Sequence, residues 1–468
     1  MSEQKRIEQL ERELAEVREQ LAQRDAIITH LQQQIADLQG RLGKDSHNSH
    51  KPPSSDGFKR RPPAPRTGEA KRRGSPIGHR GETLHLKEHP DQIERHRPST
   101  CTNCGALLEG EAGQLVERRQ VVELPEIRVA VIEHRQERVW CPQCQQPTTG
   151  TFPDEVSSRI QYGPRLQALG VYLRMQHLVP VERTSEVLHA LTGEAIAGAT
   201  ILAWEHAAAQ AVAPAIEEVR EALRHAEVMH GDETSLRIGT ILHWVHVHST
   251  RLLTLLQWHR KRGRPAMDEL GVLPLFSGTL VHDRWESYWP YPCRHALCHA
   301  HLLRDLQGIW ETTQQSWAKT MHDGFLDMLA ATGQWRIQGG IPPDEPPEWE
   351  AAFWQWLDQG ERLNPARPGR KQTAAHNLAR ALRDHAPEVL AFLYDLSVPF
   401  TNNQAEQDLR MLKVQQKIAG CCRSDTGATA LCRLRSAISC LRKQGRDVLS
   451  ALAILCSGHP ISLLPVSA

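Results

Sequence analysis

The chain has 468 residues, and its 56 Lys and Arg side chains almost balance its 55 Asp and Glu side chains. Hydrophobic residues make up 40% of the sequence and charged residues 24%, so at roughly 100–200 residues per domain we expect two to four globular units. No apolar run approaches the roughly 20 residues of a transmembrane helix, and the charged N-terminal stretch is unlike a signal peptide. We therefore expect a cytoplasmic protein with no membrane partner, whose 11 cysteines stay reduced.

The near-zero net charge hides an uneven distribution along the chain. Residues 43–80 hold 10 basic and 3 acidic side chains, a balance of +7, and residues 409–446 hold 9 and 1, a balance of +8. Residues 305–361 hold 2 basic and 10 acidic side chains, a balance of −8. The difference in charge between segments says more about binding partners than the net charge of the chain does. We expect nucleic acid to follow the two basic segments and to avoid the acidic one.

Residues 1–42 show the pattern of a coiled coil. Ile7, Leu14, Leu21 and Ile28 begin one heptad series, and Leu10 begins the other, over five heptads in total. A lone helix cannot bury so narrow an apolar stripe, so the pattern favours a parallel homodimer, with the order beyond a dimer left open. The alternative is a helix packed on its own globular domain.

Residues 43–82 predict a basic disordered linker, because they are rich in Pro, Ser, Lys and Arg and poor in apolar side chains. Its cluster Lys71, Arg72 and Arg73 would gain phosphate contacts by releasing counterions from DNA. A linker that only improves solubility is the alternative.

Two CxxC pairs in residues 83–150 indicate a zinc ribbon that binds DNA. Cys101 and Cys104 form the first pair, and Cys141 and Cys144 form the second, with 36 residues between the pairs. Four thiolates complete a tetrahedral structural zinc site and leave no position open for water. Alternating Val, Ile and Arg between the pairs predict short antiparallel strands.

Residues 151–225 predict a helical domain, and residues 226–420 predict an α/β catalytic domain. Three strand patterns with tight turns come first, and strands then alternate with helices, which is the order of the ribonuclease H-like fold. A helical insertion at about 306–397 interrupts this domain and contains half of the 12 tryptophans. We expect these tryptophans to fill the core of the insertion, with base stacking as the alternative. Residues 421–468 predict a basic C-terminal helical segment whose cations follow DNA.

Three acidic side chains are the candidate ligands of catalytic Mg²⁺ or Mn²⁺. Asp232 and Asp283 are predicted to close two neighbouring strands, and Glu406 lies in the first turn of a helix that Thr401, Asn402 and Asn403 are predicted to cap. Carboxylates at such positions can hold two ions, which clamp the attacking and leaving oxygens of a phosphoryl transfer. The neighbouring acids Glu233, Glu286 and Asp408 are not distinguished from them by the sequence.

Further candidate residues lie on both sides of Glu406. Cations that follow Glu406 are predicted to contact DNA, and they are Arg410, Lys413, Lys417 and Arg423. Cys298 and His301 form a CxxH pair that could shape the active site or position DNA, although two ligands are too few for a closed zinc site. The alternative for this pair is a packed cysteine and a capping histidine.

Several motifs resemble those of the insertion sequence 66 family of bacterial transposases. They are HGDETS, KRGRPAMDELGVLPLFSGTLVHDRWESYW, CHAHLLRDL, TNNQAEQDLR and QQKIAGCCRS, with KPPSSDG and PIGHRG in the linker. The resemblance covers nearly the whole chain. It implies a DDE transposase with Asp232, Asp283 and Glu406 as metal ligands, terminal inverted repeats as the DNA target, and helper proteins encoded by the same element.

The sequence therefore predicts a DNA transposase that cuts the ends of its insertion sequence and transfers the strands to new DNA. The sequence also fits two other functions. One is a catalytically silent, zinc-containing DNA-binding regulator, and the other is a ribonuclease H-like nuclease without strand transfer.

Overall fold

A computed structural model of the chain describes residues 14, 17–21, 23–25, 28 and 84–465. The described residues form two compact units, one within 59–130 and one that holds the rest. Within this described part, no helix is long and apolar enough to cross a membrane. The predicted linker and its cluster Lys71, Arg72 and Arg73 lie outside the described residues.

Most of the predicted coiled coil also lies outside the described residues. Those that are described between 14 and 28 are helical. Among them, Leu14, Val17, Leu21 and Ile28 belong to the heptad series, and each is about half exposed.

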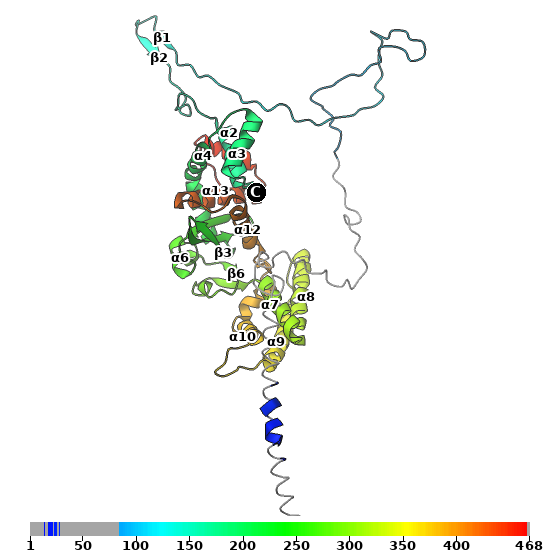
Figure 1. Cartoon of the computed structure of the whole chain (residues 1–468), viewed down its shortest axis with the longest axis vertical. Helices are drawn as coiled ribbons and strands as arrows, with labels where there is room; N and C mark the ends of the chain where they lie inside the picture. Colours follow the sequence, from blue (N-terminus) through cyan, green and yellow to red (C-terminus); the bar gives the residue numbers. More distant parts are fainter. Residues whose placement is uncertain (1–13, 15–16, 22, 26–27, 29–83, 466–468) are drawn as a thin grey trace, which may run out of the picture. The chain divides into compact units, whose positions relative to one another are not determined.

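A five-stranded mixed sheet forms the centre of the larger unit (green in Figure 1). Its strand order is β5-β4-β3-β6-β7, in which β3, β4 and β5 pair antiparallel and β6 and β7 run parallel to β3. A two-residue turn joins β3 to β4, and Gly239 takes the left-handed φ of +58° that this turn requires. The strands are β3 (Val228–Ile238), β4 (Ile241–Ser249), β5 (Thr254–His259), β6 (Thr279–His282) and β7 (Arg294–Leu297).

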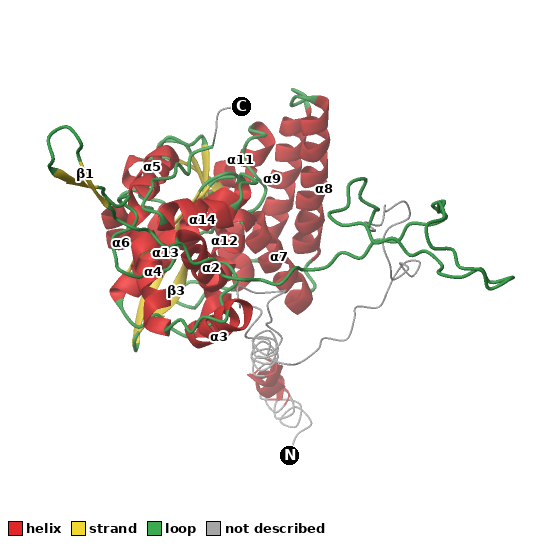
Figure 2. Ribbon diagram, turned by 90° about the horizontal axis from the view of Figure 1, so that it is seen from above, coloured by secondary structure: helices red, strands yellow, loops and turns green. Residues whose placement is uncertain are grey.

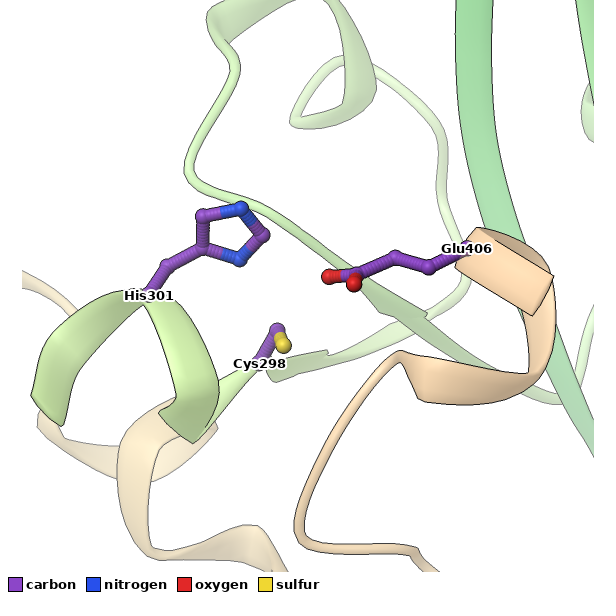
Figure 3. A group of neighbouring side chains, drawn as sticks. All are labelled: Cys298, His301 and Glu406. Carbon is purple, nitrogen blue, oxygen red and sulfur yellow. The ribbon is translucent and has the colours of Figure 1, made fainter. Parts of the chain in front are cut away.

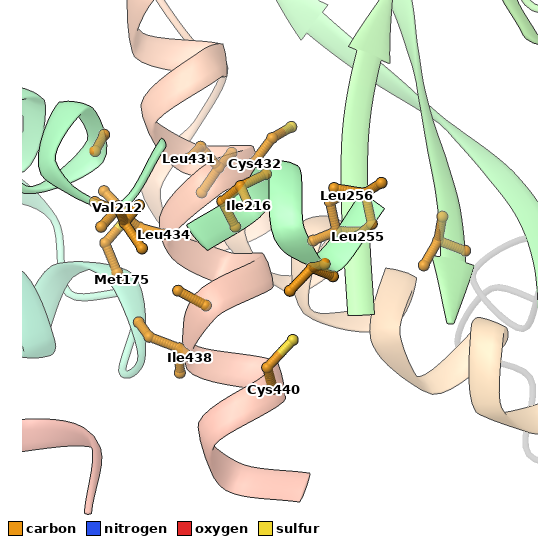
Figure 4. Close-up of a cluster of buried hydrophobic side chains, with 14 of the residues drawn as sticks. Met175, Val212, Ile216, Leu255, Leu256, Leu431, Cys432, Leu434, Ile438 and Cys440 are labelled. Carbon is orange, nitrogen blue, oxygen red and sulfur yellow. The ribbon is translucent and has the colours of Figure 1, made fainter. Parts of the chain in front are cut away.

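Helices that lie before, between and after the strands in the chain share the first hydrophobic core with the sheet. Helix α13 runs through this core, with Leu434 and Ile438 among side chains of the preceding helices and Leu255 and Leu256 of β5 nearby (Figure 4). The helices are α2 (Pro164–Met175), α3 (Val181–Thr192), α4 (Gly198–Ala211), α5 (Ala213–Arg224), α6 (Arg264–Leu270), α12 (Asn403–Ala419), α13 (Asp425–Lys443) and α14 (Val448–Cys456).

A second core is built by the helices between β7 and α12. Helices α8 and α9 pack side by side, as Figure 2 shows. Trp317 and Trp335 of α8 are fully buried in this second core. The predicted use of the tryptophans in core packing is confirmed for these two. The helices are α7 (His299–Thr313), α8 (Ser316–Gln338), α9 (Glu345–Leu363), α10 (Ala374–Asp384) and α11 (Ala386–Tyr394).

Strand β6 lies between the two cores. Leu280 belongs to the first core and its neighbour Val281 to the second, because successive side chains of a strand point to opposite faces of the sheet. Asp283 follows this strand directly, so its position depends on the packing of both cores.

The strands predicted between the two CxxC pairs are absent from the described residues 111–137. Among the described residues of this region, strand pairing occurs only in the segments that flank each CxxC pair. There β1 (Arg138–Trp140) pairs with β2 (Pro147–Thr149), and Thr100 forms a bridge with Leu107. The alternating Val and Ile side chains, such as Val116 and Val121, are instead largely exposed. Alternation alone did not predict pairing here, because an extended segment needs a partner strand to become a sheet.

The prediction that the cations after α12 follow DNA is wrong for two of them. Arg435 is buried in α13 and donates to the Met175 carbonyl at 2.9 Å, and burial lowers its pKa to about 10. Lys443 is bonded to Asp408 inside the fold. The basic segment therefore offers fewer cations to DNA than its charge of +8 suggests.

Candidate active site

The two predicted aspartates come together where β3 and β6 stop pairing. The parallel register ends with His230 opposite Val281, so two further residues place Asp232 opposite Asp283. The prediction that Asp232 closes its strand is wrong, since it is the fifth of the eleven residues of β3. What ends at this point is the parallel pairing of β3 with β6, while β3 continues alongside β4.

Glu406 comes from the first turn of α12, which packs against β3 and β4. Burial raises the pKa of Asp232 well above its ordinary value, and the charges of Glu233, Asp283 and Glu406 raise it further. The Oε1 atom of Glu406 is buried and has no hydrogen-bond partner. Mutually repelling, half-buried carboxylates with an unsatisfied oxygen fit a divalent cation, which would neutralise them.

The neighbouring acids have other partners or lie elsewhere. Arg262 bonds the carboxylate of Glu233 at 2.6 Å, and the Tyr288 hydroxyl donates to it at 2.7 Å, leaving the Glu233 side chain only 2% exposed. Glu286 is exposed in a short 3-10 turn, Glu286–Tyr288. The structure thus distinguishes acids that the sequence left equivalent.

Asp408 belongs to a buried polar network instead of the acidic cluster. Its carboxylate accepts from Lys443 Nζ at 2.8 Å, from Ser439 Oγ at 3.0 Å and from Thr254 Oγ1 at 3.1 Å. The network joins α12, α13 and β5, so its contribution is to stability.

Replacing Asp408 with alanine is expected to lower the free energy of unfolding by about 3 kcal/mol, because it leaves the Lys443 ammonium buried without its counter-charge. The shift of the urea unfolding midpoint measures this loss. Asp358→Ala is the matched control, since it breaks a half-exposed ion pair with Arg383 and should cost under about 1 kcal/mol. Equal losses in the two variants would contradict the assignment.

Both ends of α12 are bonded to β3. At the start, the Asn402 Oδ1 accepts from His230 Nδ1 at 2.9 Å, and its Nδ2 donates to the Gly231 carbonyl at 2.8 Å. Past the end, the Cys422 N–H donates to the Arg237 carbonyl at 3.1 Å. Asn402 is the residue before α12, as predicted, but its side chain binds the strand and does not cap the helix. This bonding fixes Glu406 relative to Asp232.

Cys298 and His301 lie beside Glu406. The candidate ligand atoms of these three side chains all lie within 4.8 Å of one another, and Figure 3 shows them pointing toward a common point. Cys298 is the residue before α7, and His301 lies in the first turn of that helix. The sequence identified the pair and Glu406 separately but did not predict that they meet, because Glu406 is more than 100 residues away in the chain.

The predicted DNA-binding cations beyond Glu406 are all exposed. Arg410, Lys413 and Lys417 lie on α12 at spacings of three and four residues, and Arg423 follows the helix. Lys413 also donates to the Ser235 side chain at 2.8 Å and to its carbonyl at 3.1 Å, so its ammonium is partly engaged.

The two CxxC pairs have the same local structure. In the first, Gly105 N–H donates to the Cys101 carbonyl at 2.9 Å, and in the second, Gln145 N–H donates to the Cys141 carbonyl at 2.8 Å. The residue after each pair has a positive φ, 74° for Gly105 and 53° for Gln145. Backbone N–H groups of the next residues lower the pKa of the Cys101 and Cys141 thiols. These turns therefore favour thiolates, the form that binds zinc.

Carboxylates from β3, from the end of β6 and from α12 lie near one another at this sheet and suit a divalent metal ion, and the sequence comparisons identify the class of protein. A model described as the transposase IS66 family matches residues 159–430, more than half of the chain. A model described as the zinc-finger binding domain of transposase IS66 matches residues 98–145, and a family of unknown function matches residues 2–85. Nothing among the curated proteins matches the chain.

The chain therefore belongs to the IS66 family of transposases. It is a DDE transposase, which implies transposition, DNA binding and a divalent metal ion. Its zinc-finger domain with CxxC pairs implies zinc.

Proposed function

We propose that the protein binds the inverted-repeat ends of its insertion sequence, cuts the DNA there and transfers the strands to target DNA. Asp232, Asp283 and Glu406 are the proposed ligands of Mg²⁺ or Mn²⁺ in a ribonuclease H-like catalytic domain. The strand order β5-β4-β3-β6-β7 supports this fold. The observation that carries the proposal is the convergence of three acids from β3, from the end of β6 and from α12.

The protein's own residues hold these acids in place. Trp285 N–H donates to Asp283 at 2.9 Å, Glu233 N–H donates to Asp232 at 2.8 Å, and Asn402 ties α12 to β3. When bound there, Mg²⁺ would stabilise the charge that develops on the attacking and leaving oxygens. No covalent intermediate with the protein is required.

The two N-terminal regions have proposed roles in DNA binding and in pairing two copies of the protein. Residues 83–150 form a zinc ribbon in which Cys101, Cys104, Cys141 and Cys144 hold one Zn²⁺ and which contacts the DNA ends. Residues 1–42 form a coiled coil that pairs two copies, and the half-exposed heptad residues described above support this. Paired copies suit the synapsis of two ends, and helper proteins of the same element are further partners.

The exposed cations of α12 are expected to contact the phosphate backbone. The double substitution Arg410→Gln and Lys417→Gln should weaken DNA binding and should reduce the slope of log affinity against log salt by about 2, because each lost phosphate contact removes about 0.9. Fluorescence anisotropy at several salt concentrations measures the slope. Arg380→Gln is the control, since this exposed arginine lies on α10 and pairs with Asp384. An unchanged slope in the double variant would place the DNA elsewhere.

A direct test uses the full chain with a duplex that carries the element's own terminal repeat. Transposition predicts nicking at the element end with Mg²⁺, followed by joined products when target DNA is present. Specific binding without nicking in Mg²⁺ or Mn²⁺ would instead support a silent DNA-binding regulator. Nicking without joined products would support a nuclease.

A further inference from the structure

We propose that Cys298, His301 and Glu406 form a second zinc site, which differs in ligand chemistry from the cluster of acids and shares Glu406 with it. The proposal that zinc binds here rests on the positions of these three side chains. Whether this zinc ion affects catalysis depends on the proposed role of Glu406 as a ligand of Mg²⁺.

The three residues are brought together by two elements that meet at this point. Cys298 follows β7 directly and precedes α7, and His301 lies three residues further on, so both side chains lie on one side of the helix start. Glu406 reaches the same place from α12, and the ligand atoms lie within 4.8 Å of one another (Figure 3). Zinc bonds of 2.0–2.3 Å place tetrahedral ligands about 3.5 Å apart, a distance that side-chain rotations can reach.

The surroundings of Cys298 and Glu406 favour a bound cation. The Asn402 N–H donates to Cys298 Sγ at 3.1 Å, and the Asn402 side chain is itself fixed by His230 and Gly231. Such hydrogen bonds from residues around a metal site orient the ligand. Cys298 is only 2% exposed, and Glu406 Oε1 is buried without a hydrogen-bond partner.

The ligand set selects the cation. A thiolate, an imidazole and a carboxylate suit Zn²⁺, whereas Mg²⁺ prefers oxygen ligands alone. Three protein ligands leave one position open for water or for an oxygen of the DNA. A zinc ion at this site would link the start of α7 to α12, and it would therefore hold the carboxylate of Glu406.

The test is the zinc content of the purified full chain after dialysis, measured without DNA. Wild type is expected to hold two zinc ions per chain, one in the ribbon and one here. Cys298→Ser, His301→Ala and Glu406→Gln should each hold one, and so should the double variant Cys101→Ser and Cys104→Ser. Cys293→Ser is the matched control, because Cys293 is a buried cysteine five residues upstream that lies outside the group, and it should keep two.

One zinc ion in wild type that disappears with the ribbon cysteines would overturn the inference, and so would two zinc ions in Glu406→Gln. The glutamine variant keeps the shape of the side chain, so the test does not depend on the stability of the cysteine variant. Nicking by the same wild-type preparation in Mg²⁺ is measured separately. One zinc ion with normal nicking contradicts the second zinc site alone, and two zinc ions without nicking contradict the proposed function alone.

Discussion

Replacing Asp232 with asparagine is expected to lower Mg²⁺-dependent DNA cleavage at least about a thousandfold. Loss of a metal ligand removes several kcal/mol of transition-state stabilisation, and about 4 kcal/mol corresponds to this factor. Single-turnover cleavage of a labelled element end measures the effect. Glu286→Gln is the control, because this nearby acid is exposed, and it should cleave at nearly the wild-type rate.

The same substitution is expected to raise the melting temperature of the metal-free protein. Asp232 is buried near the charges of Glu233, Asp283 and Glu406, and asparagine removes the repulsion without changing the shape. Mg²⁺ should stabilise wild type but not the variant, and binding to DNA ends should stay nearly intact in both. Cleavage by Asp232→Asn within tenfold of wild type would exclude Asp232 as a ligand.

Removing zinc from the full chain is expected to abolish the protection of residues 98–145 against hydrogen exchange. Apolar burial contributes little within 84–130, where Val116 is 95% exposed and Val121 86%. Zinc–thiolate bonds, which supply about 10 kcal/mol or more in zinc-finger peptides, are then the main source of stability for this segment. Binding to DNA ends should fall with the protection.

Exchange measured by mass spectrometry with and without a chelator tests this expectation. Peptides from α13 serve as the internal reference, because they belong to the first hydrophobic core. Cys104→Ser should reproduce the effect of the chelator, whereas Cys421→Ser, an exposed cysteine outside both pairs, should not. Equal protection of 98–145 with and without zinc would show that its packing needs no metal.

The features that the sequence predicted well are those with local causes. The CxxC spacing fixes the turns at Cys101 and Cys141, since each turn is closed by hydrogen bonds within six residues. The strand patterns and their order predicted a mixed sheet, because period-two alternation and short turns determine pairing nearby in the chain. Of the candidate acids, Asp283 does follow its strand directly, whereas Asp232 lies inside β3, and their role as metal ligands stays a prediction.

The features that the sequence missed depend on contacts between distant residues. Asn402 was expected to cap its helix, but it binds His230, which is 172 residues away in the chain. Arg435 and Lys443 were expected to face DNA, but one is buried against a carbonyl and the other against a carboxylate. The charge of a residue does not reveal such burial. The meeting of Cys298 and His301 with Glu406 had no sequence signal beyond the CxxH spacing.

The position of β6 between the two cores has a consequence for how the protein unfolds. Leu280 and Val281 are adjacent in the chain but stabilise different cores, so neither core can open fully without disturbing the strand that the other one needs. We therefore expect the inserted helices and the sheet to unfold as one cooperative unit, although each has a hydrophobic interior of its own. Asp283 stays in place only while this whole unit is folded.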